Sequence, residues 1–276
     1  MLLVRDILDW LDFYAPFRYA ASWDQCGLQV GDPEAPVKRV LVALDPNTAT
    51  LGEAEERECQ CLVTHHPLFL HPLKAVRADQ FPGNLILRGV LRGIHLIAAH
   101  TNLDVAKGGT NDHLGQMLSI HTLQPLDCDD PRVGEDRYSG MGLTGFLPQS
   151  MSFRALVEKT SKALGGIAVR AVGHGEKQVH RVALCTGSGG SLMEQVISAG
   201  SDVFITGDVK YHDAQRALEA GLALIDIGHF ASERIIVRPL AAFLRAQAVA
   251  RREALEVLEA RVERDPFWHP SRDAND

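Results

Sequence analysis

Strand-like segments alternate with helix-like segments along the sequence, and the same series of segments occurs once in each half. Apolar runs rich in β-branched residues predict strands, and turn formers such as Asp45-Pro46-Asn47 end them. Strands that alternate with helices favour an α/β architecture with a mainly parallel sheet. The predicted strands are residues 37–44, 59–64 and 93–99 in the first half and 179–185, 202–206 and 222–227 in the second.

The two halves also resemble one another in detail. VKRVLVALD, which begins at Val37, is similar to VHRVALCTG, which begins at Val179, although single-residue gaps are needed further on. We therefore predict two related lobes that face each other, each a mixed, mainly parallel sheet flanked by helices. In each half, a histidine at a strand end is followed four residues later by a carboxylate: His100 and Asp104, then His229 and Glu233.

The predicted lobes are separated by a polar, acidic segment with turn formers at residues 124–139. We interpret it as a linker and divide the chain into a first lobe at 1–125 and a second at 126–245. Residues 241–264 are rich in Ala, Leu, Glu and Arg, which is typical of a solvated amphipathic helix. We accordingly expect a C-terminal helical tail at 246–276.

Composition excludes several classes of protein. Of the 276 residues, 46% are hydrophobic and 23% charged, which is typical of a folded globular chain rather than a disordered one. The net charge of −7 and the lack of a dense basic run disfavour nucleic acid as a partner. No apolar run approaches the ~20 residues of a membrane span. We therefore expect a soluble enzyme or a binding protein.

Two further features favour the cytoplasm. Charges at Arg5 and Asp6 come too early for a secretory signal peptide. The five cysteines include no Cys-x-x-Cys pair, so we expect reduced thiols.

Three polar clusters follow predicted strands. They are His65-His66, the segment from His100 to Asp104, and the segment from His229 to Glu233. Parallel sheets carry functional groups at the carboxyl ends of their strands. With 12 histidines in the chain, each cluster taken alone is better explained by ordinary surface or core histidines than by a metal site. Three clusters in matching places favour a shared site.

The residue types in these clusters suit divalent metals. Imidazole and carboxylate together bind zinc, iron or manganese, whereas calcium and magnesium prefer oxygen alone. Adjacent His65 and His66 point in different directions on an extended backbone, so they suit two metals better than one. Asp104 and Glu233 are the candidates to bridge two ions, which at a spacing of ~3.5–4 Å would acidify a shared water.

Weaker signals lie elsewhere, and each has a structural alternative. The glycine-rich segment at 186–191 is either an anion-binding loop or a plain tight turn. Asp208 and His212 are candidates to move protons, or belong to a structural turn. Trp23 and Asp24 either contact a substrate base or pack an N-terminal turn.

Five motifs together resemble one family, the GTP cyclohydrolase 1 type 2 family, also called Nif-three-like dinuclear metal centre proteins. The resemblance runs from about residue 5 to residue 245. The motifs are SWDQCGLQVGD at 22–32, HHP at 65–67, HTNLD at 100–104 with GGTND at 108–112, TGD at 206–208 with Tyr211-His212, and Gly228-His229 with Ser232-Glu233.

The resemblance implies two α/β lobes with a site for two divalent metal ions between them, in a ring-shaped homohexamer. Matching residues in this chain assign the metal ligands: one ion takes His66 and Asp104, the other takes His65 and His229, and Glu233 bridges. His100 is a near neighbour of the ligands.

The activity implied by the resemblance is that of a metal-dependent hydrolase. Its substrate would be a small molecule with a purine-type ring, such as the nucleotide GTP, opened with loss of formate. Glu233 and Asp104 are the expected catalytic residues. The alternative is a non-catalytic role, in which a metal-bearing ring serves as a scaffold or regulator.

Overall fold

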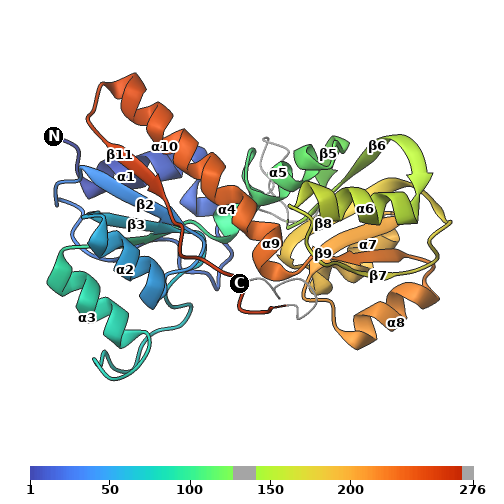
Figure 1. Cartoon of the computed structure of the whole chain (residues 1–276), viewed down its shortest axis with the longest axis horizontal. Coiled ribbons are helices and arrows are strands. Elements are labelled where there is room, and N and C mark those ends of the chain that lie inside the picture. Colours follow the sequence, from blue (N-terminus) through green and yellow to red (C-terminus); the bar gives the residue numbers. More distant parts are fainter. Residues whose placement is uncertain (127–140, 269–276) are drawn as a thin grey trace. The chain divides into compact units, whose positions relative to one another are not determined.

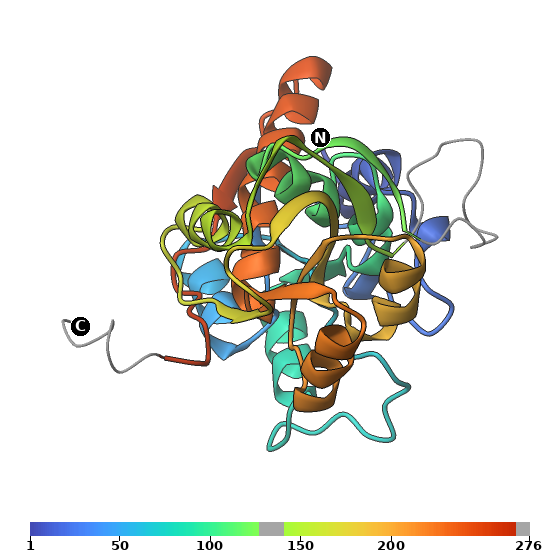
Figure 2. The same ribbon diagram turned by 90° about the vertical axis from the view of Figure 1, so that its right-hand side faces the viewer.

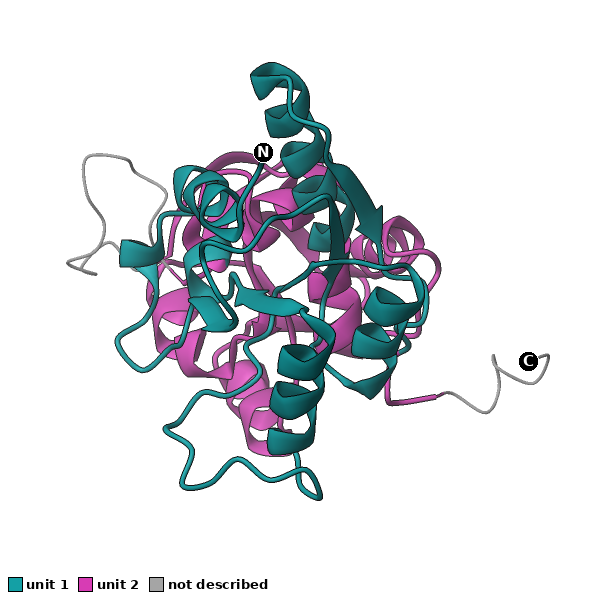
Figure 3. Ribbon diagram, turned by 90° about the vertical axis from the view of Figure 1, so that its left-hand side faces the viewer, with its two compact units in different colours: residues 1–103, 236–264 teal, residues 104–235, 265–276 magenta. Residues whose placement is uncertain are grey.

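The structure is a computed structural model of the chain, and it describes residues 1–126 and 141–268. The chain forms two compact units, drawn in teal and magenta in Figure 3. Unit 1 comprises Met1–Leu103 and Ile236–Arg264, and unit 2 comprises Asp104–Ile235 and Asp265–Asp276. Each unit is a mixed sheet flanked by helices (Figure 1), which confirms the predicted α/β fold class.

The sheet of unit 1 has the strand order β1-β4-β3-β2-β11. Only the edge strand β1 runs antiparallel to its neighbour. The central strands are buried on both faces, as expected of a parallel sheet covered by helices on each side. The strands are β1 (Gly27–Val30), β2 (Arg39–Ala43), β3 (Cys61–Thr64), β4 (His95–Ala98) and β11 (Glu256–Glu259).

Two pairs of helices cover this sheet (Figure 1). Leu41, Leu62 and Leu96 pack with residues of α2 (Thr48–Glu56) and α3 (Gly83–Arg92). On the other face, α10 (Val237–Arg251) contacts β2 and also packs against α1 (Val4–Tyr14). The short helices η1 (Phe17–Tyr19) and α4 (Thr101–Val105) complete the described elements of this region.

The sheet of unit 2 has the order β5-β6-β8-β9-β10-β7. β8, β9 and β10 are parallel to one another, and the remaining pairs are antiparallel. The strands are β5 (His121–Pro125), β6 (Leu143–Ser152), β7 (Arg170–Val172), β8 (Gln178–Ser188), β9 (Val203–Gly207) and β10 (Ala223–Asp226).

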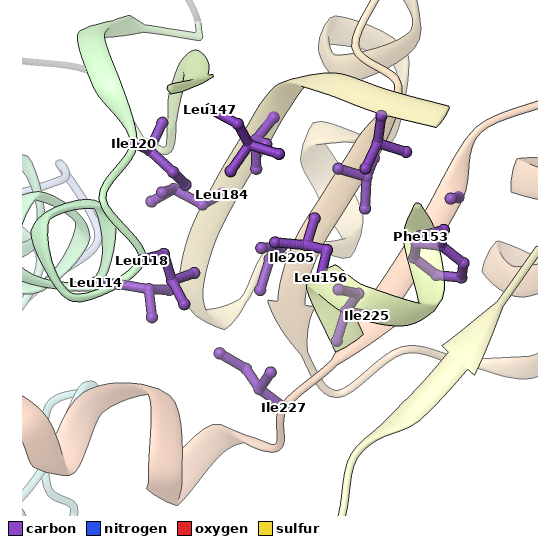
Figure 4. Packing of buried hydrophobic residues seen from close by; sticks show 14 of the residues in the cluster. Leu114, Leu118, Ile120, Leu147, Phe153, Leu156, Leu184, Ile205, Ile225 and Ile227 are labelled. Carbon is purple, nitrogen blue, oxygen red and sulfur yellow. The ribbon is translucent and has the colours of Figure 1, made fainter. Parts of the chain in front are cut away.

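Alternating side chains of these strands form two cores. Leu184, Ile205 and Ile225 pack with α5 (Thr110–Met117) and α6 (Phe153–Ala163), as Figure 4 shows. Cys185, Phe204 and Leu224 on the opposite face pack with α7 (Met193–Ser198) and α8 (Tyr211–Glu219). Figure 2 turns this unit toward the viewer. The short elements are η2 (Gly190–Leu192), α9 (His229–Glu233) and η3 (Arg234–Ile236).

The two units share a topology, which confirms that the halves of the chain are related. The order β1-β4-β3-β2 in unit 1 corresponds to β7-β10-β9-β8 in unit 2, each with an antiparallel edge strand. Thr64 pairs with Ala98, and Thr206 pairs with Asp226. His100 lies two residues after Ala98, whereas His229 lies three residues after Asp226. The single-residue gap in the alignment is therefore a real offset between the two halves.

The division of the chain differs from the contiguous lobes predicted at 1–125 and 126–245. The chain enters unit 2 at Asp104, because α5 packs against β8 and β5 pairs with β6. It returns to unit 1 at Ile236, because α10 packs against β2. Most of the predicted linker at 124–139 lies outside the described residues.

The predicted helical tail at 246–276 is wrong in its central part. α10 ends at Arg251, where Arg252 adopts a left-handed conformation with φ of +57°. Residues 256–259 then form β11, which pairs in parallel with β2. Pro239 does not break α10, because it lies in the first turn, where its missing N–H has no helical partner. No helix in 1–126 or 141–268 is long and apolar enough to cross a membrane.

Candidate metal-binding residues

Three histidines of unit 1 lie together at the carboxyl ends of neighbouring strands. His65 and His66 follow β3, and His100 follows β4, which pairs with β3 in parallel. One ring nitrogen of each lies within 4.8 Å of those of the others, a spacing at which they could hold one ion. The ring centroids of His65 and His66 are 5.1 Å apart, and that of His100 is 5.2 Å from the first and 5.6 Å from the second.

Each of these rings is oriented through Nδ1. His65 Nδ1 lies 2.9 Å from the carbonyl oxygen of Ala99, which can only accept, so this nitrogen carries the proton. His66 Nδ1 lies 2.7 Å from Asp45 Oδ1, and His100 Nδ1 lies 3.0 Å from Asp24 Oδ1. A hydrogen bond at Nδ1 that leaves Nε2 to coordinate is the usual arrangement of a metal-binding histidine.

Asp24 anchors the segment before β1 to the start of α4. Its carboxylate accepts hydrogen bonds from the backbone N–H and the hydroxyl of Thr101 and from the Cys26 thiol. Burial alone would raise the pKa of Asp24, but His100, Thr101 and Cys26 hold it well below its usual range. Burial and the Asp24 carboxylate raise the pKa of Cys26 to about 12, so this thiol stays protonated at neutral pH.

Unit 2 contributes a histidine and a buried carboxylate from α9. His229 Nδ1 lies 2.7 Å from Asp208 Oδ2, and its Nε2 lies 3.0 Å from Glu233 Oε2. The four-residue spacing on a helical turn brings His229 and Glu233 to one face. Glu233 is only 3% exposed, and a carboxylate this deeply buried needs compensating positive charge or hydrogen bonds.

Asp104 is the second buried carboxylate of unit 2. Its Oδ1 accepts a hydrogen bond of 2.5 Å from the Thr110 hydroxyl, which in turn accepts one from Thr186 on β8. Burial raises the pKa of the Cys185 thiol far above its usual range, and the carboxylates of Asp104 and Glu233 add to the shift. The negative charges of Asp104 and Glu233 therefore both act on the Cys185 thiol in unit 2.

Gly187 allows the Glu233 carboxylate to approach the backbone of β8 closely. Its φ is +65°, and a Cβ at this position would overlap Glu233 Oε1 and lie 3.4 Å from His229 Nε2. Its backbone N–H donates to the Ser232 hydroxyl at 2.8 Å, which ties β8 to α9. Only a glycine here lets the Glu233 carboxylate lie this close to the backbone of β8, next to His229 Nε2.

The backbone of the glycine-rich segment at 186–191 is used within unit 2. Thr186 N–H donates to Asn111, and Gly189 N–H donates to the Thr206 hydroxyl. These bonds, with that of Gly187, favour the interpretation as a structural turn that positions α9, rather than an anion-binding loop.

Among the predicted ligands, the structure brings His65 and His66 together in unit 1, and His229 and Glu233 together in unit 2. It adds His100 to the first pair. The sequence reasoning missed the role of Asp45, and it placed Asp208 only as a candidate to move protons. Both carboxylates follow strands, β2 and β9, which is the one signal that could have identified them.

His212 has no contact with these groups in the described residues. Its Nδ1 lies 3.3 Å from Gln215 Oε1 on the exposed side of α8. Trp23 is 53% exposed and packs its ring edge-on against His100, with centroids 6.1 Å apart. The histidine and carboxylate donors of the two units are of the kinds that bind divalent metal ions.

Known proteins are similar to this chain over nearly its whole length. A Streptomyces coelicolor protein named GTP cyclohydrolase 1 type 2 homolog is 37% identical over 233 residues, 83% of this chain and 81% of the relative. A Streptococcus pneumoniae protein of the same name is 30% identical over 272 residues, 97% of this chain and all of the relative. These relatives confirm the resemblance found in the motifs.

Solved structures show the same fold. The crystal structure of a Bacillus cereus protein related to NIF3 matches with a TM-score of 0.89 at 23% identity, over 98% of this chain and 99% of that one. The family described as Duf34/NIF3 (NGG1p interacting factor 3) matches residues 2–266. The chain therefore belongs to the Duf34/NIF3 family.

Proposed function

We propose that the protein is a hydrolase that depends on two divalent metal ions per chain. The ligands in this proposal are His65, His66, Asp104, His229 and Glu233. His66 and Asp104 would hold one ion, His65 and His229 would hold the other, and Glu233 would serve both. The ions are zinc, iron or manganese, since these histidine and carboxylate donors accept any of the three.

The observation that carries the proposal is the common orientation of the histidines. Nδ1 of His65, His66 and His229 is held by an oxygen at 2.7 to 2.9 Å, from Ala99, Asp45 and Asp208 respectively. A histidine that only fills space in a core does not need an oxygen acceptor at Nδ1, and here three histidines have one. Partners of this kind fix the tautomer and increase the basicity of the ligand.

The chain's own residues would do three things in the reaction. Asp104 and Glu233 are buried and bring negative charge that offsets the charge of the ions. Asp45 and Asp208 hold the Nδ1 atoms of His66 and His229 and so fix the orientation of both rings. Trp23 is an exposed aromatic surface beside His100, suited to a planar ring. Divalent ions, when bound, supply Lewis acidity and lower the pKa of a coordinated water.

The proposed substrate is a heterocycle of the purine type, with GTP as the first compound to test. Two relatives bear the name GTP cyclohydrolase 1 type 2 homolog, which is the reason for this choice. The test is formate release from GTP and other purine nucleotides by protein loaded with zinc, manganese or ferrous iron. Glu233→Gln and Asp104→Asn should each reduce the rate at least 100-fold, because each removes a ligand charge while preserving shape.

Glu158→Gln on the exposed face of α6 is the matched control and should leave the rate unchanged. Full activity in a Glu233→Gln protein that has lost its metal would refute the catalytic proposal. Metal binding without turnover of any heterocycle would favour the alternative function, a metal-bearing scaffold or regulator.

We also propose a homohexamer in the cytoplasm. The hexamer follows from the resemblance to the family, and native mass spectrometry should find six times the 30.2 kDa chain mass. A reducing compartment is supported by the described cysteines, Cys26, Cys59, Cys61 and Cys185, all of which are free thiols.

A further inference from the structure

A separate pocket of about 220 Å³ lies within unit 2, at the edge of the sheet where β7 pairs with β10. None of its lining residues is a proposed metal ligand. It is lined by Arg170 and Val172 of β7, by Leu224 and Asp226 of β10, and by Val209, Lys210, Tyr211 and Ala214 at the start of α8.

Arg170 places a guanidinium at this pocket, where it is ion-paired with Asp226. Its Nε and one terminal nitrogen donate to Asp226 Oδ2, and that terminal nitrogen also donates to the carbonyl of Val209. The other terminal nitrogen has no hydrogen-bond partner among the described residues, and the side chain is 73% exposed. Because Asp226 fixes the plane of the guanidinium, the two N–H groups of that other terminal nitrogen are held in place to donate to an anion.

Further positive potential comes from the start of α8. Lys210 is exposed and has no acidic side chain within 4.0 Å among residues 1–126 and 141–268. It is also the N-cap residue of α8, and no side chain caps the first N–H groups of this nine-residue helix. The two cations and the helix N-terminus therefore converge on the same rim, where the macrodipole favours an anion.

The interior of the pocket is apolar. Val172, Val209, Ala214 and Leu224 form its walls, and the largely exposed ring of Tyr211 stands at its rim. A cavity of about 150 Å³ accommodates benzene, and drug-sized ligands occupy about 300–1,000 Å³. A volume of about 220 Å³ thus holds one ring and one small substituent.

We propose that this pocket binds a small organic anion, a single ring or branched hydrocarbon bearing one carboxylate or phosphate. The apolar body lies against Val172 and Leu224, and the anionic group lies between Arg170 and Lys210. The site does not depend on the metal ions. Val209 and Lys210 directly follow Asp208, which holds His229, so an occupied pocket restrains the segment that positions this histidine.

Isothermal titration calorimetry with two probes, benzoate and phenyl phosphate, tests the proposal. At least one probe should bind with a Kd of about 10 mM or tighter, as expected for a ligand of this size. Benzyl alcohol, which has the ring but no charge, should bind at least tenfold more weakly. Inorganic phosphate, which has the charge but no ring, should also bind at least tenfold more weakly. The preferred probe identifies the anionic group.

Two variants localise the binding. Ala214→Leu fills the pocket with a residue that favours helices, and Lys210→Gln removes one cation without exposing a buried partner; each should weaken binding at least tenfold. Lys162→Gln, on α6 across the sheet, is the matched control and should bind as the unaltered protein does. Glu233→Gln, which removes a proposed metal ligand, should also leave binding unchanged.

Two results would overturn the proposal. One is the absence of binding by both probes at about 10 mM. The other is undiminished binding in both Ala214→Leu and Lys210→Gln, which would place the anion elsewhere. Loss of binding in Glu233→Gln alone would assign the anion to the metal ions and would also overturn it, without affecting the proposed hydrolase.

Discussion

At the scale of single residues, the candidate site depends on oxygens that orient imidazole rings. Asp45 and Asp208 each lie at the end of a strand, and each bonds the Nδ1 of a histidine that follows another strand. The histidines could be predicted from sequence, because His65, His66 and His229 end recognisable strands. Their partners could not, because a single carboxylate carries no periodic signal and the pairing depends on which strands are neighbours.

Replacing Asp45 tests this orientation. Asp45→Ala should weaken metal binding about 10- to 100-fold, because His66 loses the acceptor that fixes its tautomer. The measurement is competition for zinc with a chelator of known affinity. Asp79→Ala serves as the control, since within residues 1–126 and 141–268 Asp79 forms an ion pair only with exposed Arg77. An affinity within twofold of the unaltered protein would show that Asp45 does not position a ligand.

Gly187 gives a sharper test, because the chain contains a matched glycine. Gly187→Ala should lower the metal content, since its methyl group would displace Glu233. Gly165→Ala meets the same kind of backbone strain, with φ of +81°, but nothing lies within 4 Å of its Cβ. Both changes should cost about 1–3 kcal/mol of strain. Equal metal content in the two variants would contradict the role given to the close approach of Glu233 to Gly187.

At the scale of elements, local signals predicted the strands and helices that end near the site. Residues 48–56, which directly follow the predicted turn at Asp45-Pro46-Asn47, form α2, because Asn47 caps the helix by accepting from the N–H groups of Ala49 and Thr50. β11 was missed, because its four residues lie in a stretch rich in helix-forming residues. Pairing with β2 overrides that local preference, and such pairing is invisible in the sequence.

Glu53 connects α2 to the segment after β11, and it should make stability depend on pH. Its carboxylate accepts from Arg57 and from the backbone N–H groups of Arg261 and Val262. Burial alone would raise its pKa, but these hydrogen bonds lower it below the usual value. A carboxyl with a depressed pKa stabilises the fold above its unfolded pKa, near 4.3, and this contribution is lost as pH falls through the folded pKa.

Glu53→Gln should therefore lower the Tm of the metal-free protein at pH 7 by several degrees, for a loss of about 1–2 kcal/mol. The difference from the unaltered protein should shrink as the pH falls below about 4. Glu56→Gln, on the exposed side of α2, should change the Tm little at either pH. A Glu53→Gln difference that stays constant with pH would refute the account.

At the scale of the whole molecule, the chain is a pair of units with one strand order and different additions. β11 extends the sheet of unit 1 beside β2, whereas β6 and β5 extend that of unit 2 beside β8. The repeated strand order could be predicted from the repeated pattern. The exchange of segments between the units could not, because Asp104 and Ile236 are marked by no linker composition.

The most direct test of the central claim is metal content per chain. Protein purified without an affinity tag and without added metal should contain about two divalent ions per chain by elemental analysis. His65→Ala and Glu233→Gln should each reduce that number, and His174→Ala, an exposed histidine of unit 2, should not. Absence of metal, together with no uptake of zinc, manganese or ferrous iron at neutral pH, would contradict the claim.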